Sequence, residues 1–306
     1  MLRAILAASF AMTCLASTAD AVERKRLGFG ILFTNDFVDG TEDRWRTGSV
    51  TSSRVWGPEW TGAAPSGFGD LLELRIHGEV ISPANLQSPT AGDRRYAGAL
   101  SLGLHTHMTR GATELALGAD VVFVGPQTQL DEFQSGLHDL FSISEPSDAV
   151  LGNQIENEIR PTLVFEAGRS FQVGSNSALR PFIEARAGIE TLARVGVDWT
   201  FGGLGQGALM VREPVAGQRY EVVGSEWTGT SFVLGADIAY VDSSVFLPDD
   251  GTGPALEETR HRLRAGVAWQ RPSGFNAFVG LSYLGEEFEG QDEGQFVGAL
   301  RVGFGF

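Results

Sequence analysis

Apolar residues alternate with small or polar residues along most of the chain, and this period of two is typical of β-strands with two unlike faces. Residues 295–306 show the pattern clearly. Phe296 and Leu300 fall on one face, whereas Ala299 and Arg301 fall on the other. A soluble β-sandwich would bury the apolar face in a core. A membrane β-barrel would turn that face toward lipid and place the arginine in its lumen.

The same separation of charged from apolar positions recurs elsewhere. Leu263 and Trp269 alternate with Arg262 and Arg264, and Ile183 lies on the face opposite a glutamate and an arginine. We expect twelve strands, an even number of the kind that closed bacterial barrels contain. They cover residues 27–35, 45–55, 71–81, 95–107, 113–124, 159–169, 179–190, 193–201, 227–241, 259–271, 275–284 and 295–306. Alternation does not define sharp strand boundaries for the eighth strand, residues 193–201, or within residues 202–224.

The first residues have the pattern of a secretory signal. They contain Arg3, a short apolar stretch and an Ala-Asp-Ala site. We therefore expect a signal peptide at residues 1–21 and a barrel domain at residues 22–306. Because Cys14 lies in the signal, the mature protein is expected to contain no disulfide bond.

Composition narrows the class of protein further. The formal net charge of -15 argues against a nucleic-acid partner. After the signal, no stretch approaches the roughly 18 apolar residues that a transmembrane helix needs. An export signal combined with many alternating segments and a terminal aromatic residue favours a barrel over a secreted sandwich. We expect an all-β fold, namely a 12-stranded antiparallel transmembrane β-barrel, monomeric and surrounded by outer-membrane lipid.

One connection has helical rather than strand periodicity. After Pro126, apolar residues recur at Leu130, Phe133 and Leu137, which predicts a short helix in an extracellular loop. If both termini are periplasmic, the connections after the first, third and fifth strands share the extracellular rim. The Asn-Asp pair that follows the first strand should then meet the loop at residues 82–98 and this helix.

Four sequence blocks in this part of the chain occur in a familiar order: TNDFVDGTEDRWRTGS, GDRRYAGALSLG, VGPQTQLDEFQSGLHDL and NQIENE. Together they resemble the outer-membrane lipid A 3'-O-deacylase family. The resemblance covers roughly residues 27–160 and extends more loosely over the remaining strands. It implies a twelve-stranded barrel and a calcium-dependent esterase that removes the 3'-linked acyl chain from lipid A.

The resemblance also implies roles for individual residues. The catalytic set would be Asn35, Asp36, Thr47 and His138; Asp36 and Glu145 would bind Ca²⁺; and Arg94, Arg95 and Gln134 would contact lipid A. The implied mechanism is similar to that of secreted phospholipase A2, with a histidine-activated water and a metal-stabilised oxyanion. Gln134 lies one helical turn before the histidine and could orient its ring or only solvate the helix.

Two positions depart from the family pattern. Arg46 stands where a tyrosine is common, and a loop lysine found in some members has no counterpart, because Lys25 is the only lysine in the chain. These departures affect the secondary oxyanion donors and the contacts to lipid A phosphate, for which Arg94 or Arg95 are the candidate replacements.

These residue types suit the implied chemistry, although each residue also has an ordinary structural explanation. Imidazole can accept a proton from water near neutral pH, and Ca²⁺ prefers oxygen ligands such as carboxylates. Taken alone, however, Asn-Asp at a strand end is common turn chemistry, a strand threonine is unremarkable, and a histidine on a helix is usually a surface or packed residue.

Two alternatives to the calcium-dependent deacylase stay open. One is a catalytically inactive barrel, either a pore or a structural protein. The other is a serine-histidine deacylase or phospholipase of another barrel family. The chain has no G-x-S-x-G motif, which argues against an α/β-hydrolase.

Overall fold

A computed structural model of the chain describes residues 23–38, 43–88, 90, 92–141, 145–251 and 253–304. Five side chains within these ranges also fall outside the description: Leu137, His138, Leu140, Phe141 and Phe304. The signal peptide expected at residues 1–21 lies outside the described residues.

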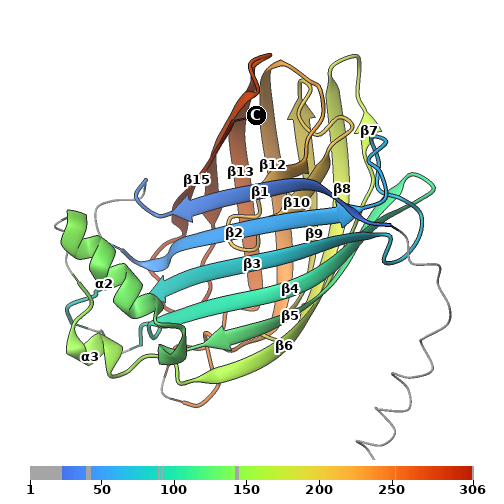
Figure 1. Cartoon of the computed structure of the whole chain (residues 1–306). Coiled ribbons are helices and arrows are strands. Elements are labelled where there is room, and N and C mark those ends of the chain that lie inside the picture. The colour runs from blue at the N-terminus through green and yellow to red at the C-terminus, as the bar shows by residue number, and fades with distance from the viewer. Residues whose placement is uncertain are drawn as a thin grey trace, which may run out of the picture.

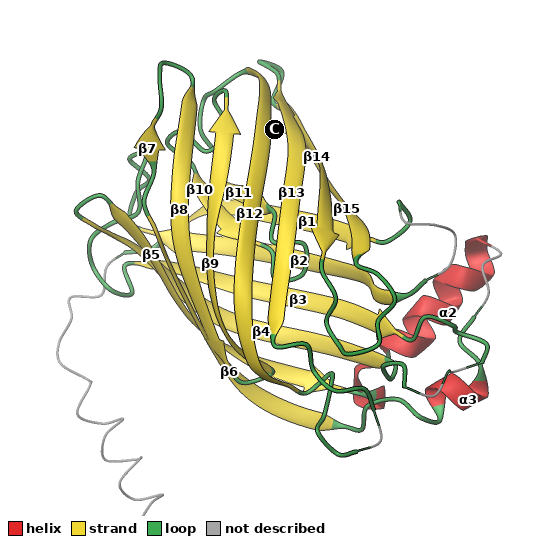
Figure 2. Cartoon of the chain, turned by 180° about the vertical axis from the view of Figure 1, so that it is seen from behind, coloured by secondary structure: helices red, strands yellow, loops and turns green. Residues whose placement is uncertain are grey.

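In the described part of the chain, twelve antiparallel strands form the wall of a closed barrel (Figures 1 and 2). Their order around the wall follows the chain, and pairing of β6 with β8 closes the ring. The wall strands are β1 (Lys25–Asn35), β2 (Trp45–Gly57), β3 (Leu71–Ser82), β4 (Ala97–Arg110), β5 (Thr113–Val124), β6 (Glu158–Gly168), β8 (Ser177–Ala187), β9 (Glu190–Phe201), β12 (Gly229–Ser244), β13 (Thr259–Gln270), β14 (Phe275–Leu284) and β15 (Gln295–Phe304). All twelve expected strands are confirmed. A two-residue strand, β7 (Phe171–Gln172), extends β8 at one end.

The two faces of the wall strands have opposite character, as the alternation predicts. On β13, Leu263 is 55% exposed, whereas its neighbours Arg262 and Arg264 are each 5% exposed. Successive side chains of a strand point to opposite faces, so the apolar set covers the outside of the barrel and the charged set fills the lumen. The assignment of arginine to the inner face is therefore confirmed.

Helices gather at one end of the barrel, where β1, β3 and β5 finish (Figure 1). They are the 3₁₀-helix η1 (Pro126–Thr128), α2 (Leu130–Phe141) and α3 (Asp148–Leu151). The expected loop helix is confirmed. Asp131 and Glu132 in its first turn interact favourably with the positive end of the helix dipole. Among the described residues, no helix is long and apolar enough to cross a membrane.

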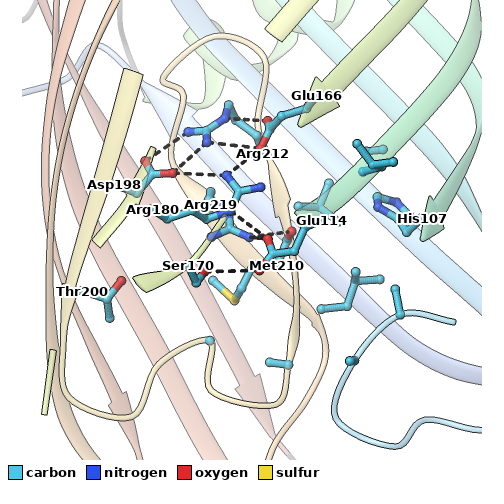
Figure 3. Close-up of a pocket in the computed structure, with 18 of the residues that line it drawn as sticks. His107, Glu114, Glu166, Ser170, Arg180, Asp198, Thr200, Met210, Arg212 and Arg219 are labelled. Atoms are coloured by element: carbon cyan, nitrogen blue, oxygen red, sulfur yellow. Dashed lines mark hydrogen bonds and ion pairs between the residues drawn. The ribbon is translucent and has the colours of Figure 1, made fainter. Parts of the chain in front are cut away.

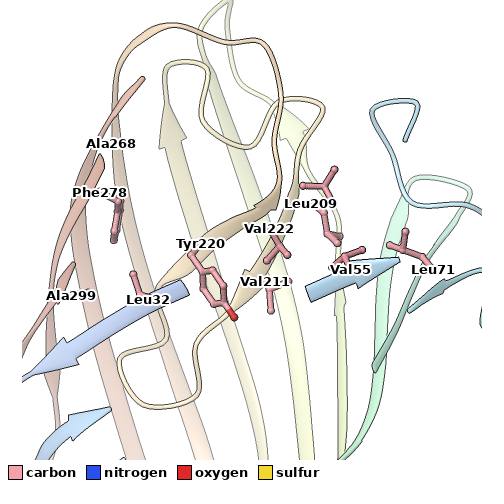
Figure 4. Close-up of a cluster of buried hydrophobic side chains, with 11 residues drawn as sticks. Leu32, Val55, Leu71, Leu209, Val211, Tyr220, Val222, Ala268, Phe278 and Ala299 are labelled. Atoms are coloured by element: carbon pink, nitrogen blue, oxygen red, sulfur yellow. The ribbon is translucent and has the colours of Figure 1, made fainter. Parts of the chain in front are cut away.

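The segment between β9 and β12 folds into the lumen as a hairpin, which alternation did not predict. Its strands are β10 (Leu209–Arg212) and β11 (Arg219–Val223). The segment leaves the wall at the end opposite α2. Figure 4 shows Tyr220 and Val222 of this luminal hairpin packed beside Leu32 of the wall. A twelve-stranded barrel encloses more space than wall side chains fill, since about eight strands give an interior that side chains alone can occupy.

Ion pairs join the luminal hairpin to the barrel wall. Arg212 lies 2.8 Å from Glu166 and 2.8 Å from Asp198, while Arg180 of the wall reaches Glu166 and Glu114 (Figure 3). Each buried carboxylate in this group thus has an arginine partner, which offsets the cost of removing it from water. A cavity of about 460 Å³ remains beside these pairs, and none of the predicted site residues lines it.

Glycines in β1 let the luminal hairpin approach the wall closely. A Cβ atom on Gly28 would overlap the backbone oxygen of Val222, and one on Gly30 would lie 2.7 Å from the backbone oxygen of Glu221. Both neighbours are backbone atoms, which cannot rotate away. The two glycines therefore set the distance between β1 and β11.

We expect Gly28→Ala to destabilise the barrel by displacing the luminal hairpin, at a cost of about 1–3 kcal/mol, as other overpacking changes do. The temperature at which the folded form disappears on an SDS gel measures this effect. Gly78→Ala is the matched control, because a Cβ there would lie 3.7 Å from Leu100, an ordinary contact. Equal transition temperatures for the two variants would contradict the packing argument.

Candidate functional site

The connection between β1 and β2 begins with a turn built by Asn35. Its side-chain Nδ2 donates to the carbonyl oxygen of Thr47 at 2.9 Å, and its Oδ1 accepts from the backbone N–H of Phe37 at 2.9 Å. Both atoms of the amide therefore hold the turn in shape, which is the ordinary chemistry of asparagine at such a position.

Asp36 points inward at the mouth of this turn. Asp36 is only 3% exposed, and its Oδ2 accepts from the backbone N–H of Arg44 at 2.9 Å. The backbone N–H of Asp36 also donates to Thr47 O at 3.0 Å. One bond thus holds the carboxylate and the other holds the backbone of the same residue, which gives Asp36 a defined position at the rim.

A β-bulge at Thr47 turns Arg46 to the inner side, where Thr47 already lies by alternation from Ser49. The register of β2 against β3 shifts between Arg46 and Gly48, so Thr47 has no direct partner on β3. Trp45, Arg46 and Thr47 are consequently all buried, although strict alternation would expose one of them. The hydroxyl of Thr47 lies 2.8 Å from that of Ser82.

Helix α2 is tied to the β1–β2 connection through Gln134. This side chain is buried; its Nε2 donates to Asp43 Oδ2 at 2.5 Å, and its Oε1 accepts from the hydroxyl of Tyr96 at 2.8 Å. Burial raises the pKa of Tyr96, with a further contribution from the carboxylate of Asp131, so the phenol keeps its proton. Both atoms of the Gln134 amide serve to hold the helix in place.

The structure locates the backbones of the remaining predicted residues. His138 lies in α2 one turn beyond Gln134, at the same rim as Asp36, and its side chain is outside the described residues. Glu145 is exposed and its carbonyl oxygen accepts from Gln87 Nε2 at 2.5 Å. Within the described ranges, no group of three or more His, Cys, Asp or Glu side chains could hold a metal ion.

The two candidate arginines occupy different environments. Arg94 is 2% exposed and pairs with Glu287 inside the barrel mouth. Burial lowers its pKa, and the pairing with Glu287 only partly offsets that effect. Arg95, by contrast, is partly exposed and lies 2.8 Å from Asp250 at the rim. Of the two, Arg95 is the one that an external anion can reach.

Arg46 is the centre of an ion network beneath the rim. Its guanidinium lies 2.8 Å from Glu79, 2.9 Å from Glu287 and 3.4 Å from Glu190. Burial would raise the pKa of Glu287, but the guanidiniums around it, that of Arg46 above all, hold the pKa well below its usual range. The three glutamates lie far from Arg46 and from one another in the sequence, so no local sequence pattern predicts these ion pairs.

Asp43 and Tyr96 are site residues that the sequence analysis did not single out. Both fall inside the blocks that carry the family resemblance, so membership of a block was the available signal. Their role depends on Gln134, which contacts both, and that contact follows from the docking of α2 rather than from any spacing in the chain.

The rim that contains this site is strongly acidic. Residues 125–157 and 245–258 contain several aspartates and glutamates but no lysine or arginine. Because clustered negative charges attract cations and repel anions, the rim should concentrate cations from solution and repel a bare phosphate group.

Comparisons with known proteins agree with this architecture. The solved structure of LpxR from Salmonella typhimurium is similar, with a TM-score of 0.75 at 16% sequence identity over 91% of this chain and 100% of that one. The NanC porin and the translocator domain of the autotransporter NalP from Neisseria meningitidis are more distant, each with a TM-score of 0.42. NanC is 6% identical over 91% of this chain and 100% of its own, and NalP is 11% identical over 100% and 96%.

No curated protein matches the sequence. A family model described as "Outer membrane protein LpxR" matches residues 4–306, nearly the whole chain. The chain therefore belongs to the LpxR family of outer-membrane proteins.

Proposed function

We propose that the protein is an outer-membrane lipid A deacylase that hydrolyses the 3'-linked acyl ester with a water activated by His138. Membership of the LpxR family supports the activity, and the rim geometry supports the location of the site. Lipid A lies in the outer leaflet, which surrounds the rim where α2 meets the β1–β2 connection.

One observation carries the proposal: Gln134 of α2 donates to Asp43, whose neighbour Arg44 donates its backbone N–H to Asp36. Two hydrogen bonds thus link the helix that carries His138 to the loop that carries the buried carboxylate. An acid and a base far apart in the sequence are held at one rim, as the ester chemistry requires.

In the proposed reaction, the imidazole of His138 takes a proton from water while the water oxygen attacks the carbonyl carbon of the ester. The carbonyl oxygen gains negative charge in the tetrahedral intermediate. The carbon–oxygen bond to the 3' position then breaks, and the imidazolium returns the proton to the departing sugar oxygen. The products are a fatty acid and lipid A with a free 3' hydroxyl group.

Calcium fits the donor chemistry of the turn, although the described residues alone do not form a complete ligand set. Asp36 is buried, and Ca²⁺ prefers carboxylate and carbonyl oxygens. Glu145 is the second proposed carboxylate. A bound Ca²⁺ would stabilise negative charge on the ester oxygen. The acidic rim supports this proposal because it raises the local concentration of cations.

Arg95 is the proposed contact for a lipid A phosphate. It is paired only at the rim, with Asp250, whereas Arg94 is enclosed and paired with Glu287. Arg46 is likewise engaged by three glutamates. Neither buried arginine is free to follow a substrate, so the departure at position 46 changes the interior of the barrel rather than its rim.

We expect His138→Ala to abolish deacylation, because loss of a general base lowers rates by about 10²- to 10⁴-fold. Asp36→Asn should also lower the rate strongly, since it keeps the shape of the side chain but removes its charge. Mass spectrometry of lipid A before and after incubation with purified protein measures the loss of one acyl chain. Glu132→Gln, on the exposed side of α2, is the control and should retain wild-type activity. Unaltered lipid A with the wild-type protein would refute the proposed activity.

We also expect activity to depend on calcium. Dialysis against a chelator should reduce deacylation at least about tenfold, and added Ca²⁺ should restore it, because the metal is proposed to remove several kcal/mol from the barrier. The Asp36→Asn variant should need more Ca²⁺ for half-maximal activity than Glu132→Gln. Full activity in excess chelator would contradict the role of the metal.

A pore is the main alternative for a barrel of this size, and the luminal hairpin disfavours it. Arg212 of the hairpin bridges Glu166 and Asp198. Arg262 of the wall donates to the carbonyl oxygen of Pro214, in the turn of the hairpin, at 2.9 Å. These contacts occupy the middle of the lumen.

We therefore expect the purified protein to show no stable ion conductance in planar bilayers, because the hairpin blocks the path through the lumen. Single-channel recording measures this directly, with an open porin as the positive control. A steady conductance that His138→Ala leaves unchanged would support the pore instead.

A further inference from the structure

The turn of the luminal hairpin, residues 213–218, presents a buried carboxylate to the inner face of β2. Glu213 is 0% exposed, and its Oε1 accepts from the hydroxyl of Ser49 at 3.0 Å. The same carboxylate closes its own turn, because Oε1 accepts from the backbone N–H of Val215 at 3.0 Å and Oε2 from that of Ala216 at 2.6 Å. Backbone N–H groups of the hairpin thus hold the carboxylate in the orientation in which it contacts the wall.

Ser49 passes this contact on to β1. It lies directly opposite Thr34 in the β1–β2 pair, and the two hydroxyl oxygens are 2.7 Å apart. Since a carboxylate only accepts, Ser49 donates to Glu213 and must accept its other bond from Thr34. The direction of the whole chain of hydrogen bonds is therefore fixed by one charge.

This chain ends directly beneath the proposed catalytic turn. Thr34 precedes Asn35 and Asp36, and Ser49 follows Thr47 by two residues. The next bonds toward the rim are those from the backbone N–H of Asp36 and from Asn35 Nδ2 to Thr47 O. Support from the lumen therefore reaches the two strand ends that carry the site.

The other side of the hairpin turn is anchored to the part of the wall that contains β13 and β14, from which β15 and β1 separate β2. Gln218 Nε2 donates to the backbone oxygen of Ala265 at 3.1 Å and to the hydroxyl of Ser282 at 3.2 Å. Arg262 of that wall donates to the carbonyl oxygens of Pro214 and Val215. The turn thus connects β13 and β14 to β2 on the inner side of the barrel.

We propose that Glu213 is a positioning residue for the deacylase reaction, and that it acts through Ser49 and Thr34 to fix the strand ends that carry Asp36 and Thr47. The inference rests on the proposed function. It gives the luminal hairpin a role beyond filling the barrel, because the bonds from Glu213 end at Thr34, the residue before Asn35.

Glu213→Gln and Ser49→Ala test the inference. Ser49→Ala removes the hydroxyl that joins the hairpin to β1, and Glu213→Gln places an NH₂ donor where Oε2 accepts from the Ala216 N–H, which displaces the side chain from its turn. Both changes leave the side-chain volume nearly unchanged. We expect kcat to fall about tenfold or more with KM within about twofold, since a small misplacement of catalytic groups can cost about 10²-fold in rate. The double variant should fall no further than the more impaired single variant, because both act on the same chain of hydrogen bonds.

Ser53→Ala and Tyr220→Phe are the matched controls. Ser53 is also a buried β2 serine that faces the hairpin, and its hydroxyl lies 2.6 Å from that of Tyr220, but it lies four residues farther from the site. These variants should keep kcat within about twofold of wild type. Equal losses in the test and control variants, or an unchanged kcat in Glu213→Gln and Ser49→Ala, would overturn the inference.

A second measurement separates this inference from the activity itself. Hydrogen exchange of the Asp36 amide, which donates to Thr47 O, should be faster in Glu213→Gln than in wild type and unchanged in Ser53→Ala. Wild-type protein that leaves lipid A intact would refute the proposed function but would leave this exchange test valid. An Asp36 amide equally protected in all variants would show that the hairpin does not brace the turn.

Discussion

Pairing of buried charges inside the lumen is the constraint on which this structure depends. A strand places every second residue on the inner face, so a barrel that shows an apolar surface to lipid must accept its charged residues inside. Such charges are tolerated when an opposite charge satisfies them, and loss of one partner of a buried pair costs about 3–5 kcal/mol. Arg46 meets Glu79 of β3, Glu190 of β9 and Glu287 of the β14–β15 connection. Arg212 of the hairpin bridges two more acids. The hairpin is thus needed electrostatically as well as sterically.

The wall of the barrel could be predicted from sequence because each wall strand has one face in lipid and the other in the lumen. Leu263 beside Arg262 is a clear case of that contrast. The luminal hairpin gave no such signal, because both of its faces meet protein. Tyr220 and Val222 pack on the wall, while Arg212 and Arg219 of the same short strands form ion pairs. Gly28 and Gly30 acquire their meaning only once Val222 and Tyr220 are known to approach them.

The proposed site was predictable at the level of topology and not at the level of contacts. Counting strands places the β1–β2 connection and α2 at one rim, and the structure confirms that arrangement. Gln134 was expected to contact lipid A, orient the histidine or solvate the helix. In the structure it joins α2 to the loop through Asp43, and its contact with lipid A stays a prediction. Arg94 and Arg95 are adjacent in sequence, yet one is enclosed and the other is at the rim. Such differences depend on which side chains the folded loops bring within reach, and alternation carries no information about that.

Charge is distributed differently in the lumen and at the rim, and this difference links the fold to the proposed chemistry. Inside the barrel, many buried acids have an arginine partner, such as Asp198 with Arg212 and Asp237 with Arg262, which offsets the cost of burying them. At the rim, residues 125–157 and 245–258 contain aspartates and glutamates but no lysine or arginine. An anionic lipid approaches such a rim only when cations screen the repulsion. The same cations would occupy carboxylate sites such as Asp36, so substrate approach and metal loading would respond to one variable, the concentration of divalent cations at the membrane surface.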